Sequence, residues 1–506
     1  PQDRRKEPLL PNFNLRLRVG DSLVQKIGNI SFNLEDIEIS RDIKRKLDSL
    51  RIEKEKFYRN DPSRKFSTSD SVQNEENRIF CEILENEKIK IDQEIQKLNI
   101  KLKQSNQLTI YGKTNIDRKH KEKINKELEN LKQQKIDIIN IGRELTTKGK
   151  QFVIWEIDFV DVFQDKKGFD VVIGNPPYIR QEKISPPSKP RSESTDRERK
   201  KYKDDLIENI KIKYPFIKKI DKKCDYYIYF YLKGLSLLNP LGTFCFITSN
   251  SWLDVGYGKV LQEFLVKYTP IKVIYDNQAK RSFAHASVNT VIILLGSPNI
   301  IDKKNPTPTS LENIAKFVMF KKPFEEVVSY KNMVTIHDFL PEKQNLFGNT
   351  FKDDNLRIYA ISQKELLLEG IEKKDKEANS FKNQIVGKYK GSKWGGKYLR
   401  APDIFFTILE KGKDKLVRLG DIADLRFGIK TGANEFFYVW DVTEKIDFTS
   451  KKHQIKNLGE IVSFDEIKKS NLRIVYNRKH NSYWLIEEEF LKPIIQSPRE
   501  CKSITI

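Results

Sequence analysis

The residues best suited to chemistry form a short run, Asn175-Pro176-Pro177-Tyr178, directly after the apolar, β-branched residues 169–174. That apolar segment is typical of a buried parallel strand, and open α/β sheets bind their ligands at the carboxyl ends of such strands. Two successive prolines fix the backbone φ angles and remove two N–H donors, which leaves the Asn175 side-chain oxygen and the Pro176 carbonyl free to accept. The loop therefore presents two acceptors to one amino group.

This arrangement fits methylation of an exocyclic amine on a flat heterocycle. An amine conjugated with its ring is a poor nucleophile, and two acceptors that hold its N–H groups turn the nitrogen lone pair toward a sulfonium methyl group. The aromatic ring of Tyr178 can stack on a base that has left its duplex. Neither a metal ion nor a covalent intermediate is required. The alternative is an ordinary Asn-Pro turn that closes a strand.

The composition narrows the possible partners. The chain has 506 residues and a net charge of +22, which favours a nucleic acid, because lysine and arginine gain by releasing counterions from phosphates. A lysine-rich surface that merely solvates helices is the alternative. A hydrophobic content of 38% excludes disorder over the full length. Four separated cysteines suggest neither a metal site nor disulfides. No apolar run reaches the roughly 20 residues of a membrane span, so a cytoplasmic protein without a membrane partner is expected.

The pattern of apolar residues predicts the elements that position the loop. Residues 34–150 carry Ile and Leu at spacings of three and four, which predicts amphipathic helices packed as a hairpin. Residues 151–302 alternate β-branched runs with helical segments, which predicts an α/β sheet covered on both faces. A loop is expected over 185–203 and a domain linker over 303–310, because both are rich in proline and polar or charged residues. The pattern of apolar residues over 311–506 indicates a domain of mixed secondary structure and does not predict its fold.

The catalytic-loop sequence also resembles a known family. Residues 155–163 and 168–179 are similar to the N6-adenine DNA methyltransferases of the TaqI-like, Eco57I-type arrangement, and further similar segments follow in the same order at 225–230, 242–253 and 283–295. The resemblance implies a Rossmann-like methyltransferase sheet, S-adenosylmethionine as the cofactor and double-stranded DNA as the substrate. It also implies a place in a restriction-modification or phage-defence enzyme.

The resemblance assigns roles in the reaction to individual residues. Asn175 and Pro176 would grip the amino group of the target adenine, with Pro177 completing the rigid loop. Tyr178 would stack on the flipped adenine, and Phe283 would pack on the base from another side.

Cofactor and DNA contacts are implied at other positions. Asp21 follows an apolar-polar alternation over residues 12–19, which predicts a strand that ends in an acidic loop, and by resemblance Asp21 would accept from the cofactor adenine. In the C-terminal third, residues 428–437 resemble part of the specificity domain of that family, and by this resemblance Lys430, Thr431 and Asn434 would contact DNA. No residues are expected to bind a metal.

The implied domains follow the same order. They are the end of the cofactor-binding half of a methyltransferase domain at 1–33, a helical insertion at 34–150, the catalytic half at 151–302 and a target-recognition domain, expected to be incomplete, at 303–506.

One departure from the family pattern concerns the cofactor site. The glycine-rich cofactor loop should precede the acidic loop by several dozen residues, and Asp21 lies too near the first residue for that. We therefore expect the glycine-rich loop in an upstream portion or in a separate chain. Two alternatives stay open, a DNA-recognition module without catalysis and a methyltransferase for RNA or for a protein glutamine.

Overall fold

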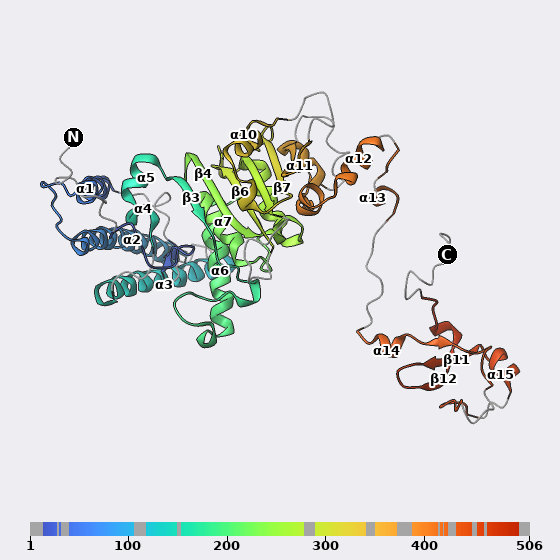
Figure 1. Cartoon of the computed structure of the whole chain (residues 1–506). Helices are drawn as coiled ribbons and strands as arrows, with labels where there is room; N and C mark the ends of the chain where they lie inside the picture. Colours follow the sequence, from blue (N-terminus) through green and yellow to red (C-terminus); the bar gives the residue numbers. More distant parts are fainter. Residues whose placement is uncertain are drawn as a thin grey trace. The chain divides into compact units, whose positions relative to one another are not determined.

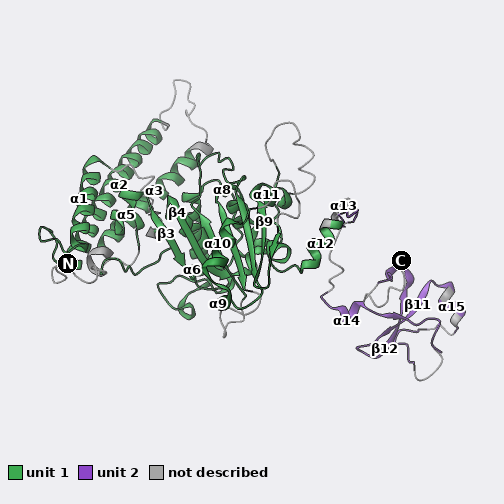
Figure 2. Ribbon diagram, turned by 45° about the horizontal axis from the view of Figure 1, so that its top comes forward, with its two compact units in different colours: residues 1–411 green, residues 412–506 purple. Residues whose placement is uncertain are grey.

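The computed structural model describes most of the chain, in two compact units that are treated separately below (Figure 2). The units comprise residues 1–411 and 412–506. The described residues are 14–27, 30–31, 40–105, 118–148, 153–277, 289–340, 350–371, 387–412, 415–417, 419–423, 432–447, 453–459 and 463–494.

A seven-stranded mixed sheet forms the centre of the first unit (Figure 1). Its strand order is β3-β4-β6-β5-β7-β9-β8. The strands β3 and β4 are parallel, β6 runs antiparallel to both of its neighbours, and β5 is parallel to β7. The bounds are β3 Phe169–Gly174, β4 Leu238–Ser249, β5 Ile271–Asn277, β6 Thr290–Gly296, β7 Ile314–Phe320, β8 Thr350–Lys352 and β9 Leu356–Ser362. The expected Rossmann-like α/β class is confirmed.

Helices cover one face of the sheet more completely than the other. On the first face, α7 (Tyr226–Ser236), α8 (Lys259–Tyr268) and α11 (Gln363–Gly370) share one hydrophobic core with β4 to β7. On the second face, α9 (Phe324–Val327) and α10 (Tyr330–Asp338) pack over β5, β7 and β9.

The expectation that β3 is buried on both faces is wrong. The strand lies at the edge of the described sheet, where Val171 is 58% and Ile173 is 76% exposed on the second face. Val172 points to the first face instead and packs against the core that contains α7. An apolar run alone cannot distinguish a central strand from an edge strand.

The helical region agrees with its periodicity. It contains α1 (Arg41–Tyr58), α2 (Ser69–Ser105) and α3 (Arg118–Lys148). The helices α2 and α3 lie side by side (Figure 2), joined by an ion pair of 2.6 Å between Lys135 and Asp92. Apolar residues of α1, α2, α3 and the following short helices form a second core, separate from that of the sheet.

Two local predictions are wrong. Residues 14–19 form a turn and irregular backbone rather than a strand, because the Arg18 side chain is drawn toward Glu76 on α2. Part of the expected loop at 185–203 is helical, since α6 (Asp196–Lys213) begins there. A capping box between Thr195 and Glu198 satisfies the first backbone N–H groups of this helix.

The first unit extends beyond the expected boundary at 302/303. The strands β7 to β9 belong to the same sheet as β3 to β6, and Trp394 and Tyr398 are buried in the same core as α7 and α8. The compact units divide instead between residues 411 and 412. Hydrogen bonds also hold residues 309 and 310 to the end of α8, where both backbone N–H groups donate to the Lys267 carbonyl.

The second unit contains a small antiparallel sheet and short helices. Its strands are β10 (Trp440–Asp441), β11 (Leu472–Asn477) and β12 (Ser482–Glu487). Residues Ile467, Ile474 and Leu485 form its core.

The remaining described strands and α-helices are β1 Lys26–Ile27, β2 Ile30–Ser31, α4 Trp155–Asp158, α5 Val160–Lys166, α12 Asp403–Lys411, α13 Leu419–Ile422, α14 Asn434–Phe437 and α15 Phe464–Lys469. Within the ranges described, no helix is long and apolar enough to cross a membrane.

Candidate functional site

The loop after β3 presents two hydrogen-bond acceptors. Asn175 is exposed and Pro176 is buried, and within the described chain no donor reaches the Asn175 side chain or the Pro176 carbonyl. Gly174 lets the end of β3 approach β4, since a Cβ at this position would lie 2.9 Å from a ring carbon of Phe246. The geometry leaves both acceptors available to a ligand.

The same loop is tied to the first residues of α7. The Ile179 carbonyl accepts from the Tyr226 N–H at 2.9 Å, and the Gln181 N–H donates to Asp225 Oδ1 at 3.1 Å. These two bonds hold the chain that follows Tyr178 against the helix.

The ring of Tyr178 is held by β4. Its hydroxyl donates to the Ile247 carbonyl at 3.2 Å, and the residue is half-buried. Burial raises the pKa of Tyr178 to about 12, so the phenol stays protonated near neutral pH. The ring therefore has a defined orientation beside the two acceptors.

A cavity of about 280 Å³ lies between this loop and α7. We refer to it as the β3–α7 cavity. It brings together five parts of the chain, namely the acidic loop near residue 22, the start of α4, β3 with its loop, α7 and β4. Its lining comprises Ser22, Leu23, Trp155, Val172, Ile173, Gly174, Asn175, Pro176, Pro177, Phe230, Lys233, Gly234, Leu237 and Phe246. Most of these side chains are apolar, as in sites that bind flat organic ligands.

Asp21 stands next to this cavity and shapes its loop. Asp21 Oδ1 accepts from the backbone N–H groups of Leu23 at 2.9 Å and Val24 at 3.1 Å. Its other oxygen accepts from the Tyr202 hydroxyl at 2.8 Å, and Tyr202 in turn contacts the Tyr226 hydroxyl at 2.9 Å. Burial, with the nearby Asp21 carboxylate, raises the pKa of Tyr202. Since a carboxylate offers about four acceptor positions, Asp21 retains capacity for one more donor.

Residues that the sequence did not single out as functional hold the loop that follows Asp21, which lines the cavity at Ser22 and Leu23. The Trp155 indole N–H donates to the Ser22 carbonyl at 3.1 Å. Glu156 accepts from the Gln25 side chain at 2.9 Å and contacts Lys213 Nζ at 3.3 Å. Lys233 donates to the Gln25 side chain. A single lysine within the apolar sequence of α7 was the available signal for this network.

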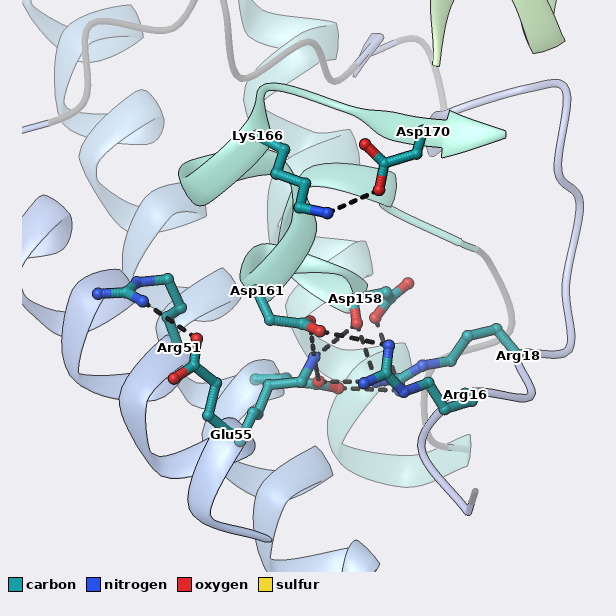
Figure 3. Close-up of polar contacts among 10 residues, drawn as sticks. Arg16, Arg18, Arg51, Glu55, Asp158, Asp161, Lys166 and Asp170 are labelled. Atoms are coloured by element: carbon teal, nitrogen blue, oxygen red, sulfur yellow. Dashed lines mark hydrogen bonds and ion pairs between the residues drawn. The ribbon is translucent and has the colours of Figure 1, made fainter. Parts of the chain in front are cut away.

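A buried ion cluster attaches these residues to the helical region (Figure 3). Arg18 donates to Glu76 through both terminal guanidinium nitrogens, at 2.7 and 3.0 Å. Lys54, which is fully buried, donates to Glu76 at 3.0 Å and to the Asp158 carbonyl at 2.6 Å. The Asp158 carboxylate accepts from the Ile154 N–H at 2.9 Å. The short helix α4, which carries Trp155 and Glu156, is thus locked to α1 and α2.

The other predicted site residues are not among the described residues of the first unit. Phe283, Lys430 and Thr431 lie outside the described residues. Asn434 is exposed at the start of α14 in the second unit. Of the residues predicted from the sequence, the structure brings together residues 175–178 and, beside them, the turn at Asp21.

Comparison with known proteins finds a family model that matches the central segment. Residues 68–283 match the model of the Eco57I restriction-modification methylase family. The matched segment contains the helical hairpin, the 175–178 loop and most of the cavity lining.

Individual relatives share shorter stretches with the chain. The type II methyltransferase M.BstVI of Geobacillus stearothermophilus is 30% identical over 125 residues, which is 25% of this chain. The match spans 18% of the length of that relative. The type IIG restriction endonuclease BpuSI has 15% identity and a TM-score of 0.26, over 39% of this chain and 19% of its own. The methyltransferase subunit of a type I restriction-modification system from Streptococcus thermophilus has 15% identity and a TM-score of 0.26, over 46% of this chain and 50% of its own.

Proposed function

We propose that this protein transfers a methyl group from S-adenosylmethionine to N6 of adenine in a specific sequence of duplex DNA, within a restriction-modification or phage-defence enzyme. The observation that carries this proposal is the pair of available acceptors, the Asn175 side chain and the Pro176 carbonyl, beside the β3–α7 cavity. The match of residues 68–283 to the model of a methylase family supports a methyl-transfer role.

The β3–α7 cavity suits part of the cofactor. Leu23, Trp155 and Phe230 offer apolar surfaces for a flat ring, and Asp21 can accept from an exocyclic amine at its edge. Bound there, S-adenosylmethionine supplies an electrophilic methyl group on sulfur. The cavity of about 280 Å³ lies below the roughly 300–1,000 Å³ that enclose a ligand of this size, so the remainder of the pocket comes from further residues.

The outer edge of β3 in the described sheet is a suitable place for those further residues. Among the described residues no strand pairs with this side of β3, and with Val171 and Ile173 exposed it would otherwise invite unspecific strand pairing. We propose that a strand from an upstream portion of the protein, or from a separate chain, pairs with β3 and brings a glycine-rich cofactor loop beside the cavity.

The loop residues do the chemical work on the base. Asn175 Oδ1 and the Pro176 carbonyl each accept one N6–H of the adenine, and Tyr178 stacks on its ring. This grip turns the N6 lone pair out of conjugation and toward the methyl carbon. N6 would accept the methyl group that the cofactor supplies, and Asn175 Oδ1 and the Pro176 carbonyl would hold its N–H groups until one proton passes to water.

Sequence recognition is proposed for the second unit. Asn434, together with Lys430 and Thr431, is the candidate for contacts with DNA, since glycine-shaped loops with amide and basic side chains can reach base edges and phosphates. The neighbouring Glu435 is held to the small sheet, because its carbonyl accepts from the Asn477 side chain at 2.8 Å. This contact would support the loop on a rigid element.

The test is a labelled methyl-transfer assay with the full-length protein. Equal masses of duplex DNA, RNA and a protein mixture compete for the methyl group of S-adenosylmethionine, and the product is identified by mass spectrometry. The proposal predicts N6-methyladenine in DNA. Label in RNA or in a glutamine side chain would change the substrate, and DNA binding without any methyl transfer would favour a non-catalytic recognition module.

A further inference from the structure

A groove of about 970 Å³ runs beside α8 and shares no lining residue with the β3–α7 cavity. Its walls are residues 215–221, which follow α6, the outer side of α8, and the segments 304–306 and 388–389. Lys218, Lys219, Lys259, Lys267, Lys304 and Lys388 line the groove, against two acids, Asp221 and Glu263.

Lysines outnumber acids six to two among the residues that line this groove. Glu263 is engaged by Lys267 one helical turn away on α8, at 2.5 Å. Lys218, Lys219 and Lys304 are exposed, and across the described ranges none of them forms an ion pair through its side chain. Lysines arranged in this way attract a polyanion, since each phosphate that they neutralise releases a counterion.

The groove is held in shape by aromatic packing. The ring of Phe216 stacks parallel to that of Phe264 at 6.2 Å and meets Tyr268 edge-on at 5.0 Å. Phe264 and Tyr268 are buried on α8. The segment that carries Lys218 and Lys219 is therefore packed against α8 in the absence of a partner.

The groove also lies near the 175–178 loop. Tyr226 follows Lys219 by seven positions, and a chain of that length spans at most about 25 Å. The Tyr226 N–H binds the Ile179 carbonyl, next to Tyr178. One turn of duplex DNA is about 34 Å long, so this wall lies within roughly one turn of a base held at Tyr178.

We propose that this groove binds the phosphate backbone of the duplex beside the target base. The inference rests on the proposed function, and it names a contact surface in the first unit that is separate from the candidate recognition residues of the second. Lysine ammonium groups are flexible point charges, which suit phosphates rather than base edges. The groove therefore contributes affinity and position, not sequence choice.

The experiment measures how DNA affinity depends on salt. The variant Lys218→Gln/Lys219→Gln/Lys304→Gln is compared with the wild type and with Lys272→Gln/Lys331→Gln/Lys364→Gln, which removes three exposed lysines outside the groove. Removing the neutralisation of one phosphate lowers the slope of log affinity against log salt by about 0.9. The groove variant should therefore lower the slope by about 2 to 3, and the control should leave it unchanged. The melting temperatures of both variants show that they are folded.

The outcomes separate this proposal from the proposed function. Equal slopes for the two variants, with methylation of DNA intact in the wild type, would overturn the groove assignment alone. Failure of the wild type to bind DNA would overturn both proposals. Polyglutamate that binds to the wild type but not to the groove variant, together with an unchanged salt slope for DNA binding, would instead assign the groove to an acidic polypeptide. A reduced slope for the groove variant, with a wild type that transfers no methyl group, would leave the groove standing and refute the catalysis.

Discussion

The buried ion cluster between α2 and α4 leads to a quantitative stability prediction. Glu76 is 2% exposed and holds two cations, Arg18 at 2.7 and 3.0 Å and Lys54 at 3.0 Å. Glu76→Gln keeps the shape of the side chain but removes the carboxylate nearest to both buried cations. Arg18 is left with Asp158 at 3.8 Å and Lys54 with Asp161 at 3.6 Å as carboxylate partners. Such a change costs about 3–5 kcal/mol. Lys54 keeps the Asp158 carbonyl as an acceptor, so we expect a value near 3 kcal/mol, about a hundredfold in the folding equilibrium.

A matched control lies one residue away on the same helix. Glu75 pairs with Arg78 at 2.6 Å, but the Arg78 side chain is 51% exposed, and such pairs contribute about 0–1 kcal/mol. Urea unfolding of Glu75→Gln and Glu76→Gln, followed by circular dichroism, compares the two losses directly. Equal losses of stability in both variants would refute the reasoning that burial decides the cost.

The same variant tests whether the cluster positions the cavity. Asp158 holds the Ile154 N–H, and the adjacent Trp155 holds the cavity loop at Ser22. Under conditions where Glu76→Gln is still folded, we therefore expect weaker binding of S-adenosylmethionine in calorimetry, with Glu75→Gln at the wild-type value. Wild-type affinity in both variants would show that the helical region does not support the cavity.

Three further changes follow from the site and its scaffold. Tyr178→Ala should raise the KM for DNA about tenfold to a hundredfold, because stacking on one base is worth about 1–3 kcal/mol, whereas Tyr178→Phe keeps the ring and should change it far less in steady-state methyl transfer. Gly174→Ala should lower stability by about 1–3 kcal/mol in thermal unfolding, because its Cβ would lie 2.9 Å from a phenyl ring, while Gly256→Ala meets no described atom within 4 Å and serves as the control. The hydrogen bond from Arg357 lowers the pKa of Asp403, so its stabilisation is present above the unfolded value near pH 4 and is lost as the pH falls through the lower folded value. In acid unfolding, Asp403→Asn should therefore lose less stability than the wild type as the pH falls below about 4. An acid profile equal to that of the wild type would contradict that assignment.

Much of the sheet could be predicted because its strands carry a strong local signal. The alternation of β-branched runs and helical segments expected over residues 151–302 corresponds to strands such as β4 and β5 and to the helices α7 and α8. Each of these elements buries a continuous apolar face in one core, so periodicity and burial agree.

The errors arise where distant residues decide the structure. Residues 14–19 alternate like a strand, but the pairing of Arg18 with Glu76, 58 positions away, holds them beside the helices. The strand β3 has the composition of a buried strand, yet its exposure depends on which elements lie beside it in the sheet. Neither fact can be derived from local sequence.

The candidate site was predictable only in part. The placement of the 175–178 loop at the carboxyl end of a strand followed from the apolar run and the prolines. The cavity beside it also needs Trp155 and Lys233, which tertiary packing alone brings next to Ser22 and Leu23. The roles proposed for Phe283 and for the DNA-contact residues remain predictions.

The most direct test of the central claim is methyl transfer by Asn175→Ala in the full-length protein. Labelled S-adenosylmethionine and duplex DNA are supplied, DNA binding is measured in parallel, and Asn299→Ala, an exposed asparagine after β6, serves as the control. We predict that Asn175→Ala loses N6-methyladenine formation by at least about a hundredfold while it still binds DNA, because one of two acceptors for the amino group is gone. Unchanged turnover by Asn175→Ala would contradict the assignment of the 175–178 loop as the catalytic loop.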